Sequence, residues 1–303
     1  MIELEKMDYK IRHPNADVAY SKLAHQFLVH SQIKPQFPLE LIQRFFQRLI
    51  SSEKNVVEVW LGDKKLACAV LVDQVTNSHA SAHVEYLGFS NFKDLHKVLA
   101  FIFNHFEART RARGKHTGLV ATHHKSLPFS QQFLIELGYT PAYKIYELEC
   151  KQVQPFMSNL NPDFQLERLQ EDDFPEYYEV LKKSFENNPD TSIGTLHDLW
   201  IGYRKQALPT FVVKQDKKMV GFCTINLDYG SNTGEINTLG VLPHHRQKGI
   251  GRYLLAIAAD HLWQQRVNAI KLSVALENLK ALKLYQNAGF EMSEEFTAFR
   301  KLL

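Results

Sequence analysis

The chain has 303 residues, enough for two domains that each bury a core. Lys and Arg number 36 against 33 Asp and Glu, a formal net charge of +3, so the overall balance indicates neither nucleic acid nor a membrane surface as a partner. A hydrophobic content of 45% excludes a disordered chain, and no apolar run approaches the roughly 20 residues of a membrane-spanning helix.

The cysteines and the first residues bear on location. Cys68, Cys150 and Cys223 lie far apart, without a CxxC pair or a histidine cluster, so we expect free thiols and no metal site. The first residues, MIELEKMDYK, are charged from the third position and lack an apolar signal core. These features predict a soluble protein of the cytoplasm.

Three patterns of the first half return in the second half, in the same order and about 150 residues later. They are VEVWLGDKKLACAVL from Val57 with FVVKQDKKMVGFCTI from Phe211, in which Asp63 matches Asp216; EYLGF ending at Phe89 with NTLGV ending at Val241; and FLIELGY ending at Tyr139 with LYQNAGF ending at Phe290. This order predicts a duplication and two tandem domains. Prolines and asparagines interrupt both periodicities between the halves, so we expect a first domain at 1–150, a linker at 151–163 and a second domain at 164–303.

The second half reads as alternating strands and helices. In chain order we expect a strand from Phe164, helices in EDDFPEYYEVLKKSFEN and around GTLHDLWIGYRKQ, strands at 211–215 and 219–227 joined by DKK, a strand at 234–242, a helix from Gly249, a strand in AIKLSVAL, a short helix ending at Gly289, and a last strand from about Thr297.

The stretch HHRQKGIGRYLL lies where the strand at 234–242 gives way to a helix. A helix N-terminus exposes unpaired backbone N–H groups and a positive dipole end, which together hold an anion. Gly249 and Gly251 remove side chains that would block that approach, while Arg246 and Lys248 add positive charge. The stretch therefore predicts a diphosphate site.

Two common diphosphate motifs do not match, because a P-loop lysine followed by Ser or Thr is absent and Leu254 stands at the third glycine of a dinucleotide fingerprint. Residues 246–251, RQKGIG, instead resemble the [RQ]xxGx[GA] signature of the GNAT superfamily of N-acetyltransferases. INTLGVLPHHRQKGIG and ALENLKALKLYQNAGF resemble its two signature regions, in the family's order, within residues 164–303.

The resemblance implies an α/β (α+β) fold of two tandem GNAT-like domains, each a mixed, mostly antiparallel sheet with helices on both faces. In the second domain it implies acetyl-CoA, or another acyl-CoA, between splayed fourth and fifth strands. The residues that it places around this cofactor are Leu239, Val241, Arg246, Gln247, Lys248, Gly249, Ile250, Gly251, Arg252 and Asn278.

Acetyl transfer to an amine requires a base, because an amine of pKa ~10 is mostly protonated at neutral pH. Glu235 matches the family's catalytic glutamate and Tyr285 its acid, which protonates the departing thiolate, while the backbone N–H of Val241 matches the oxyanion donor. A solvated strand-end carboxylate and a core tyrosine are the alternatives for the two side chains.

The first half lacks these residues. Leu127 and Leu134 stand where the second half has Asn278 and Tyr285, His83 stands opposite Glu235, and the paired glycines are absent. We therefore expect a degenerate GNAT-like domain that does not bind acyl-CoA.

The sequence thus predicts an acetyl-CoA-dependent N-acetyltransferase that acts by direct attack in a ternary complex, on a primary amine of a small molecule or peptide. One alternative is a non-catalytic acyl-CoA-binding scaffold. Another is an aminoacyl-transferase of the tandem GNAT-like type, for which the net charge of +3 gives no sign of a tRNA-binding stripe. We expect acceptor selection by residues 185–203, which carry Glu186, Asp190 and Asp198.

Overall fold

The computed structural model describes residues 9–12, 56–75, 80–89, 94–114, 118–124, 129–151, 160–186, 193, 196–204, 208–228 and 231–303. These residues fall into two compact units, unit 1 within 1–74, 79–142 and 296–303, and unit 2 within 75–78 and 143–295. Most of the predicted linker, 152–159, lies outside the described residues. No helix of the described part combines the length and the apolar character needed to cross a bilayer.

Unit 1 is a sheet covered by helices. Its strands lie in the order β1 (Tyr9–Arg12), β2 (Val56–Leu61), β3 (Lys64–Val75), β4 (Ala80–Phe89), β5 (Gly118–His124) and the end of β12 (Glu291–Leu302), with helices α3 (Leu95–Arg113) and α4 (Gln131–Glu136). The inner face of α3 buries Val98, Leu99, Ile102, Phe103 and Phe106, which recur at helical spacing. This apolar stripe packs with the strands in one core.

Unit 2 is a mixed sheet in the order β6 (Thr140–Cys150), β11 (Ala269–Ala275), β10 (Thr233–Val241), β9 (Lys218–Asp228), β8 (Thr210–Gln215) and β7 (Phe164–Arg168). Only the β10–β11 pair is parallel among these neighbours. The helices are α5 (Phe174–Ser184), α6 (Leu196–Arg204), α7 (Ile250–Gln264) and α8 (Leu279–Gln286).

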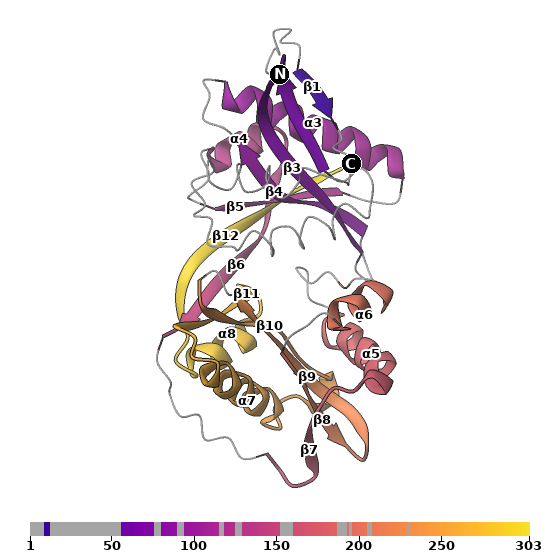
Figure 1. Cartoon of the computed structure of the whole chain (residues 1–303), viewed down its shortest axis with the longest axis vertical. Coiled ribbons are helices and arrows are strands. Elements are labelled where there is room, and N and C mark those ends of the chain that lie inside the picture. Colours follow the sequence, from indigo (N-terminus) through magenta and orange to yellow (C-terminus); the bar gives the residue numbers. More distant parts are fainter. Residues whose placement is uncertain are drawn as a thin grey trace. The chain divides into compact units, whose positions relative to one another are not determined.

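Helices cover both faces of the unit 2 sheet, as Figure 1 shows. Residues on α7 and α8 pack with Cys223 and Ile225 of β9 in one core. Residues on α5 pack with Val212 of β8 and Phe222 of β9 in a second core. Neighbouring residues of β9 thus point to opposite layers, as the period of two in a strand requires.

The last strand of each sequence half pairs with the sheet of the other half. β6, from the first half, pairs with β11 from Ile145–Ala275 to Cys150–Ile270. β12, at the end of the chain, pairs with β5 from Phe296–His124 to Leu302–Gly118. The predicted ranges 1–150 and 164–303 therefore differ from the two units at these strands, because a strand's periodicity does not name its partner.

A buried ion pair fastens the end of β12 within unit 1. Lys301 Nζ lies 2.8 Å from Glu107 Oε2 on α3, whose side chain is only 6% exposed. The same ammonium donates to the carbonyl oxygen of Leu137 at 2.7 Å. Because a buried carboxylate left without its cation is destabilising, this ion pair stabilises the contact between the end of β12 and α3.

The two halves repeat in backbone detail. Gly138 after α4 and Gly289 after α8 both have φ +86°, the left-handed conformation that glycine adopts most easily. In each case the N–H after the glycine donates to the carbonyl five residues earlier, that of Leu134 (3.0 Å) or Tyr285 (3.1 Å). The predicted match of FLIELGY with LYQNAGF is confirmed, and Leu134 holds the place of Tyr285.

The hairpin match is shifted by one residue. Its turn is Gly62–Asp63 between β2 and β3, and Asp216–Lys217 between β8 and β9. Gly62 and Asp216, at φ +58° and +50°, are therefore the equivalent residues, so the predicted match of Asp63 with Asp216 is wrong by one position. A turn needs positive φ at a given place, which the repeated letters DKK do not identify.

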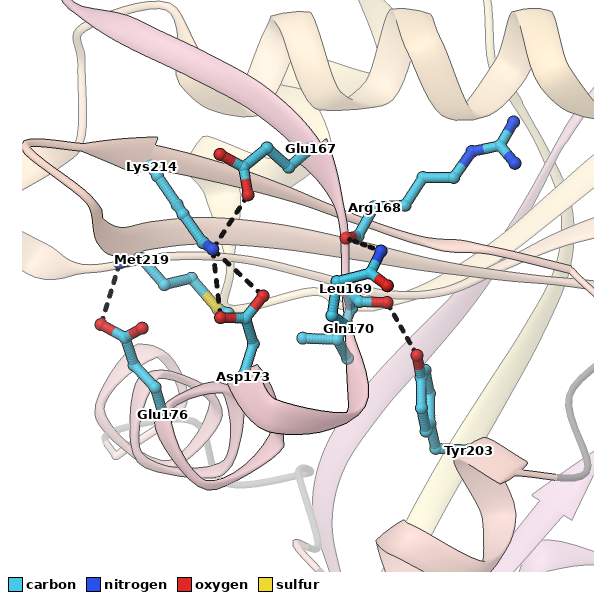
Figure 2. Close-up of polar contacts among 9 residues, drawn as sticks. All are labelled: Glu167, Arg168, Leu169, Gln170, Asp173, Glu176, Tyr203, Lys214 and Met219. Carbon is cyan, nitrogen blue, oxygen red and sulfur yellow. Dashed lines mark hydrogen bonds and ion pairs between the residues drawn. The ribbon is translucent and has the colours of Figure 1, made fainter.

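Polar contacts fix α5 and α6 over the sheet (Figure 2). Lys214 of β8 lies 2.9 Å from Glu167 Oε2 and 3.0 Å from Asp173 Oδ2, which adjoins the start of α5. Tyr203 of α6 donates its hydroxyl to the carbonyl of Leu169 at 2.7 Å. Lys214 is only 12% exposed, so this cluster is better shielded from solvent than a surface ion pair.

Candidate active site

β10 and β11 pair only at the start of β10 and then separate. Their parallel pairs are Thr233–Ala269, Gly234–Ile270 and Glu235–Lys271, and within the described residues they end there. β10 nevertheless continues to pair with β9 as far as Val241. In the described part of the chain, one edge of β10 from 236 to 241 therefore has no neighbouring strand, so its backbone groups can bind an extended ligand.

A β-bulge in β10 decides which way its side chains point. The register with β9 shifts between Ile236 and Thr238. Glu235 and Leu239 are an even number of residues apart and would share a face in a regular strand. Because of the bulge, Glu235 shares its face with α5, whereas Leu239 lies on the side of α7. No residue pattern marks this bulge, so the sequence alone does not predict it.

The glycine turn lies directly beside the parted strands. Gln247 and Gly249 have φ +65° and +82°, and α7 begins at the next residue without a side-chain N-cap. A Cβ on Gly249 would meet no atom within 4 Å, so the space in front of this helix end is open. A Cβ on Gly251 would lie 3.7 Å from Leu239 and 3.8 Å from Val241. The structure thus brings the predicted turn and the predicted strand residues together.

Arg246 has two partners within the protein that the sequence did not predict. Its Nε donates to the carbonyl oxygen of Val241 at 3.0 Å, and its Nη2 donates to that of Ser184 at 2.9 Å. These two bonds use two of the five N–H donors of the guanidinium, and the end of α5 lies within its reach. Arg246 ties the end of β10 to the end of α5, while Lys248 and Arg252 stay exposed beside the turn.

Asn278 begins α8 at the end of β11. Its side-chain oxygen accepts a hydrogen bond from the N–H of Ala281 at 3.3 Å and so caps the helix. The residue lies on the β11 side of the parted strands, where its N–H donates to the carbonyl of Ala275. Ile250, the first residue of α7, is 1% exposed and belongs to the core rather than to the open turn.

Glu235 stands in a negatively charged setting at the point of parting. Burial raises the pKa of its carboxyl, and Asp228 and Glu147 raise it further, whereas Lys271 lowers it. A carboxylate with a raised pKa accepts a proton more readily than an ordinary surface glutamate. Glu235 can therefore act as a base.

Tyr285 is 7% exposed and packs edge-on against Phe290 at 6.2 Å between ring centroids. Burial raises the pKa of its hydroxyl, and the neighbouring thiol of Cys223 raises it further. Since Cys223 is the register partner of Leu239, the hydroxyl lies near the unpaired part of β10. Tyr285 is both a core residue and a protonated donor at neutral pH.

The predicted acceptor segment is described only in part. Asp190 and the side chain of Asp198 lie outside the described residues, as does Leu127 of the first half. His244 and His245 lie in a 3-10 turn, Pro243–His245. Within the described part of the chain no group of three or more His, Cys, Asp or Glu side chains could hold a metal.

Replacing Gly240 by Ala is expected to destabilise unit 2 without touching the turn. The new Cβ would lie 2.6 Å from the ring of Phe222 and 3.0 Å from Cβ of Ser184. Overpacking of this kind costs roughly 1–3 kcal/mol, which urea unfolding can measure. Gly251→Ala is the matched control, because its new contacts are of ordinary length. Equal stability of the two variants would contradict the tight packing of α5 on β10.

Residues 165–290 match a family model described as the acetyltransferase (GNAT) family. A mycothiol acetyltransferase of Propionibacterium freudenreichii is 26% identical over 176 residues, 54% of this chain and 55% of the relative. Another, of Thermomonospora curvata, is 31% identical over 117 residues, 37% of this chain and 38% of the relative. The chain spans about half or less of the length of these relatives.

Solved structures support the fold. A GCN5-related N-acetyltransferase from Sphaerobacter thermophilus has a TM-score of 0.73 at 17% identity and covers 97% of this chain and 95% of its own. A tandem GNAT protein from the clavulanic acid biosynthesis pathway has a TM-score of 0.69 at 12% identity, covering 97% and 98%. The predicted fold class is confirmed. Since the matched model includes the parted strands and the turn beside them, residues 165–290 of this chain belong to the GNAT family of acetyltransferases.

Proposed function

We propose that the chain is an acetyl-CoA-dependent N-acetyltransferase that acetylates a primary amine of a small molecule or peptide. The observation that carries the proposal is the parting of β10 from β11 after Glu235, beside an open helix end at Gly249. GNAT enzymes in general use acyl-CoA donors. The arm of acetyl-CoA that carries the thioester needs a groove with free backbone groups, and its diphosphate needs unpaired N–H groups. The free edge of β10 and the start of α7, which lie side by side, offer these two features.

The donor is held mainly by backbone. The free edge of β10 at Leu239 and Val241 hydrogen-bonds the amide arm of the donor. The N–H groups of residues 247–252 bind its diphosphate, assisted by the exposed side chains of Lys248 and Arg252. Arg246 shapes this loop through its bonds to two carbonyl groups.

The chain's residues divide the proton transfers. Glu235 takes the proton that the amine must lose, directly or through water, and the amine nitrogen forms a bond to the thioester carbonyl carbon. The N–H of Val241 stabilises the negative oxygen that develops there. Tyr285 gives its proton to the sulfur as the carbon–sulfur bond breaks. The base and the acid lie on opposite faces of β10, so neither blocks the other.

One donor site per chain follows from the comparison of the units. In unit 1, His83 has the register position of Glu235, and Leu134 replaces Tyr285. Asp94 precedes α3, where its carboxylate repels the phosphates that the turn before α7 attracts. Unit 1 completes the fold without binding a donor.

The acceptor is a cationic amine. Asp228, Glu147 and Lys271 act on Glu235 at the point of parting, so three carboxyl groups stand against one ammonium there and the local charge is negative. Two relatives, each matched over only part of its length, bear the name mycothiol acetyltransferase, which fits an amine-bearing acceptor of low molecular mass. The acidic setting raises the local concentration of ammonium ions, from which Glu235 then removes a proton.

The proposal is tested by incubating the full chain with acetyl-CoA and a panel of amino sugars, polyamines, aminoacyl compounds and peptides. Release of the CoA thiol, followed with a thiol reagent, is expected with at least one amine. Saturable acetyl-CoA binding without turnover on a broad panel would favour the scaffold. Absence of binding would remove the proposal.

Tyr285→Phe is expected to lower kcat about tenfold or more while acetyl-CoA binding stays nearly unchanged. The variant keeps the buried ring and removes only the proton that sulfur needs. The check is kcat beside calorimetric titration, with Tyr253→Phe, on the neighbouring helix α7, as control. An unchanged kcat in Tyr285→Phe would leave the tyrosine as a core residue only.

A further inference from the structure

A charged pair, Lys271 and Glu147, lies beside Glu235. Lys271 is its register partner on β11, and Lys271 Nζ lies 2.9 Å from Oε1 of Glu147 on β6. The two side chains are 32% and 26% exposed, so the pair is partly shielded from water. Charges in such a place act on one another more strongly than fully solvated charges do.

The geometry of β6 holds Glu147 in this place. Glu147 is directly opposite Ser273 and therefore reaches Lys271 diagonally across the strands. Ser293 of β12 donates its hydroxyl to the carbonyl oxygen of Glu147 at 3.1 Å and lies 3.4 Å from Oε1. Among the described residues, Lys271 forms its ion pair with Glu147 and not with Glu235.

We propose that Glu147 and Lys271 are positioning residues for Glu235. Glu147 holds the ammonium of Lys271 toward β6, and this leaves the Glu235 carboxylate free to take a proton from the acceptor. The inference rests on the proposed function, because it takes Glu235 as the base.

The charges around Glu235 give the reason. Asp228 on β9, Glu147 on β6 and Lys271 on β11 act on it, and Glu149, the register partner of Lys271, acts on the lysine. If Lys271 turned to Glu235, the ion pair would lower the pKa of Glu235 and weaken it as a base. Glu147 offers the lysine a closer partner.

Unit 1 has no such pair. Val120 of β5 holds the register position of Lys271, and Ala298 of β12 holds that of Glu147. The pair thus occurs in the unit that carries Glu235. Since β6 comes from the first half of the sequence, that half supplies a side chain to the site of the second.

The test is a ¹³C NMR titration of the full chain labelled at glutamate carboxyl carbons, with the Glu235 resonance identified by its loss in Glu235→Gln. Glu147→Gln is expected to lower the pKa of Glu235 by on the order of one unit, since it removes a negative charge and releases Lys271. Lys271→Met is expected to raise this pKa by a similar amount. The acidic limb of the pH profile of kcat/KM should move in the same two directions.

Glu147→Gln and Lys271→Met break the same ion pair but should shift the pKa of Glu235 in opposite directions. A purely structural role of the pair would not produce opposite shifts. Glu295→Gln is the matched control, because it breaks another ion pair of β6, Lys144–Glu295 (2.8 Å) between β6 and β12, and should leave the pKa of Glu235 unchanged. A rise with Glu147→Gln, a fall with Lys271→Met, or no shift in either would overturn the proposal. Each variant decides by itself if the other does not fold.

Failure of the proposed function and failure of the positioning role give different results. If Glu235→Gln leaves acetyl transfer intact, Glu235 is not the base, and the positioning role falls with it. If Glu235→Gln removes the transfer while neither variant shifts the pKa of Glu235, only the positioning proposal fails. The titration needs no acceptor, so it does not depend on finding one.

Discussion

Gly249→Trp is expected to weaken acetyl-CoA binding by on the order of 100-fold or more, because an indole would fill the space that the diphosphate needs. A Cβ at this position has no contact within 4 Å among the described residues, so the base of the new side chain has room. Calorimetric titration of the full chain measures both affinity and stoichiometry. The wild-type chain should bind one acetyl-CoA.

The control for Gly249→Trp must separate blocking from backbone strain, because Gly249 has φ +82°. Gly114→Trp provides it: Gly114 has φ +61°, also faces open space, and lies after α3 in unit 1. Its binding should match that of the wild type. Gly249→Ala adds the strain without the bulk and should bind with intermediate affinity. Two acetyl-CoA molecules per chain, or intact binding in Gly249→Trp, would contradict the assignment of the turn.

Glu235→Gln is expected to lower kcat/KM roughly 10²- to 10⁴-fold, the range of general-base catalysis. The amide keeps the shape of the side chain and cannot accept the proton. In the wild type the acidic limb of the kcat/KM profile should lie above the ordinary glutamate pKa of about 4.3, because burial and two carboxylates raise the pKa of Glu235. The variant should lose this limb and keep only the rise that comes from ionisation of the amine.

Glu235→Gln should lower the activity without lowering the stability of the fold. Because the folded-state pKa of Glu235 lies above its unfolded value, the carboxyl favours folding at low pH, and this contribution is lost as the pH rises through the folded-state pKa. At neutral pH, Glu235→Gln should therefore unfold at an equal or higher urea concentration than the wild type. Glu291→Gln, at an exposed position of β12, is the control. Unchanged activity, or clear destabilisation, would contradict the assignment.

The local features of the fold were predictable from the sequence. The helix that begins after Gly249 and the glycine end of α8 follow from spacing and from glycine's access to positive φ, both of which depend on neighbours in the chain. The last strand was expected from about Thr297 but begins at Glu291. Its first residues form a strand because of β6, a partner distant in sequence, so their own composition does not announce it.

The candidate site divides in the same way. The turn residues were named from their glycines and basic side chains, and Glu235 and Tyr285 were named from the resemblance to the GNAT family. The backbone partners of Arg246 were not predicted, since the carbonyl of Ser184 comes near it only after α5 has packed on β10. Glu147 was missed entirely, because nothing in the pattern of the first half points to a lysine on β11.

The sequence by itself determined which segments form helices and strands, that the chain repeats, and which residues form the turn. These properties depend on short-range sterics and on periodicity. Only the tertiary structure decided that β6 and β12 exchange sheets, that the bulge sends Glu235 and Leu239 to opposite faces, and that Glu147 meets Lys271. Strand pairing and register are set by the packing of the whole sheet, and residues far apart in the chain must come together before either is defined.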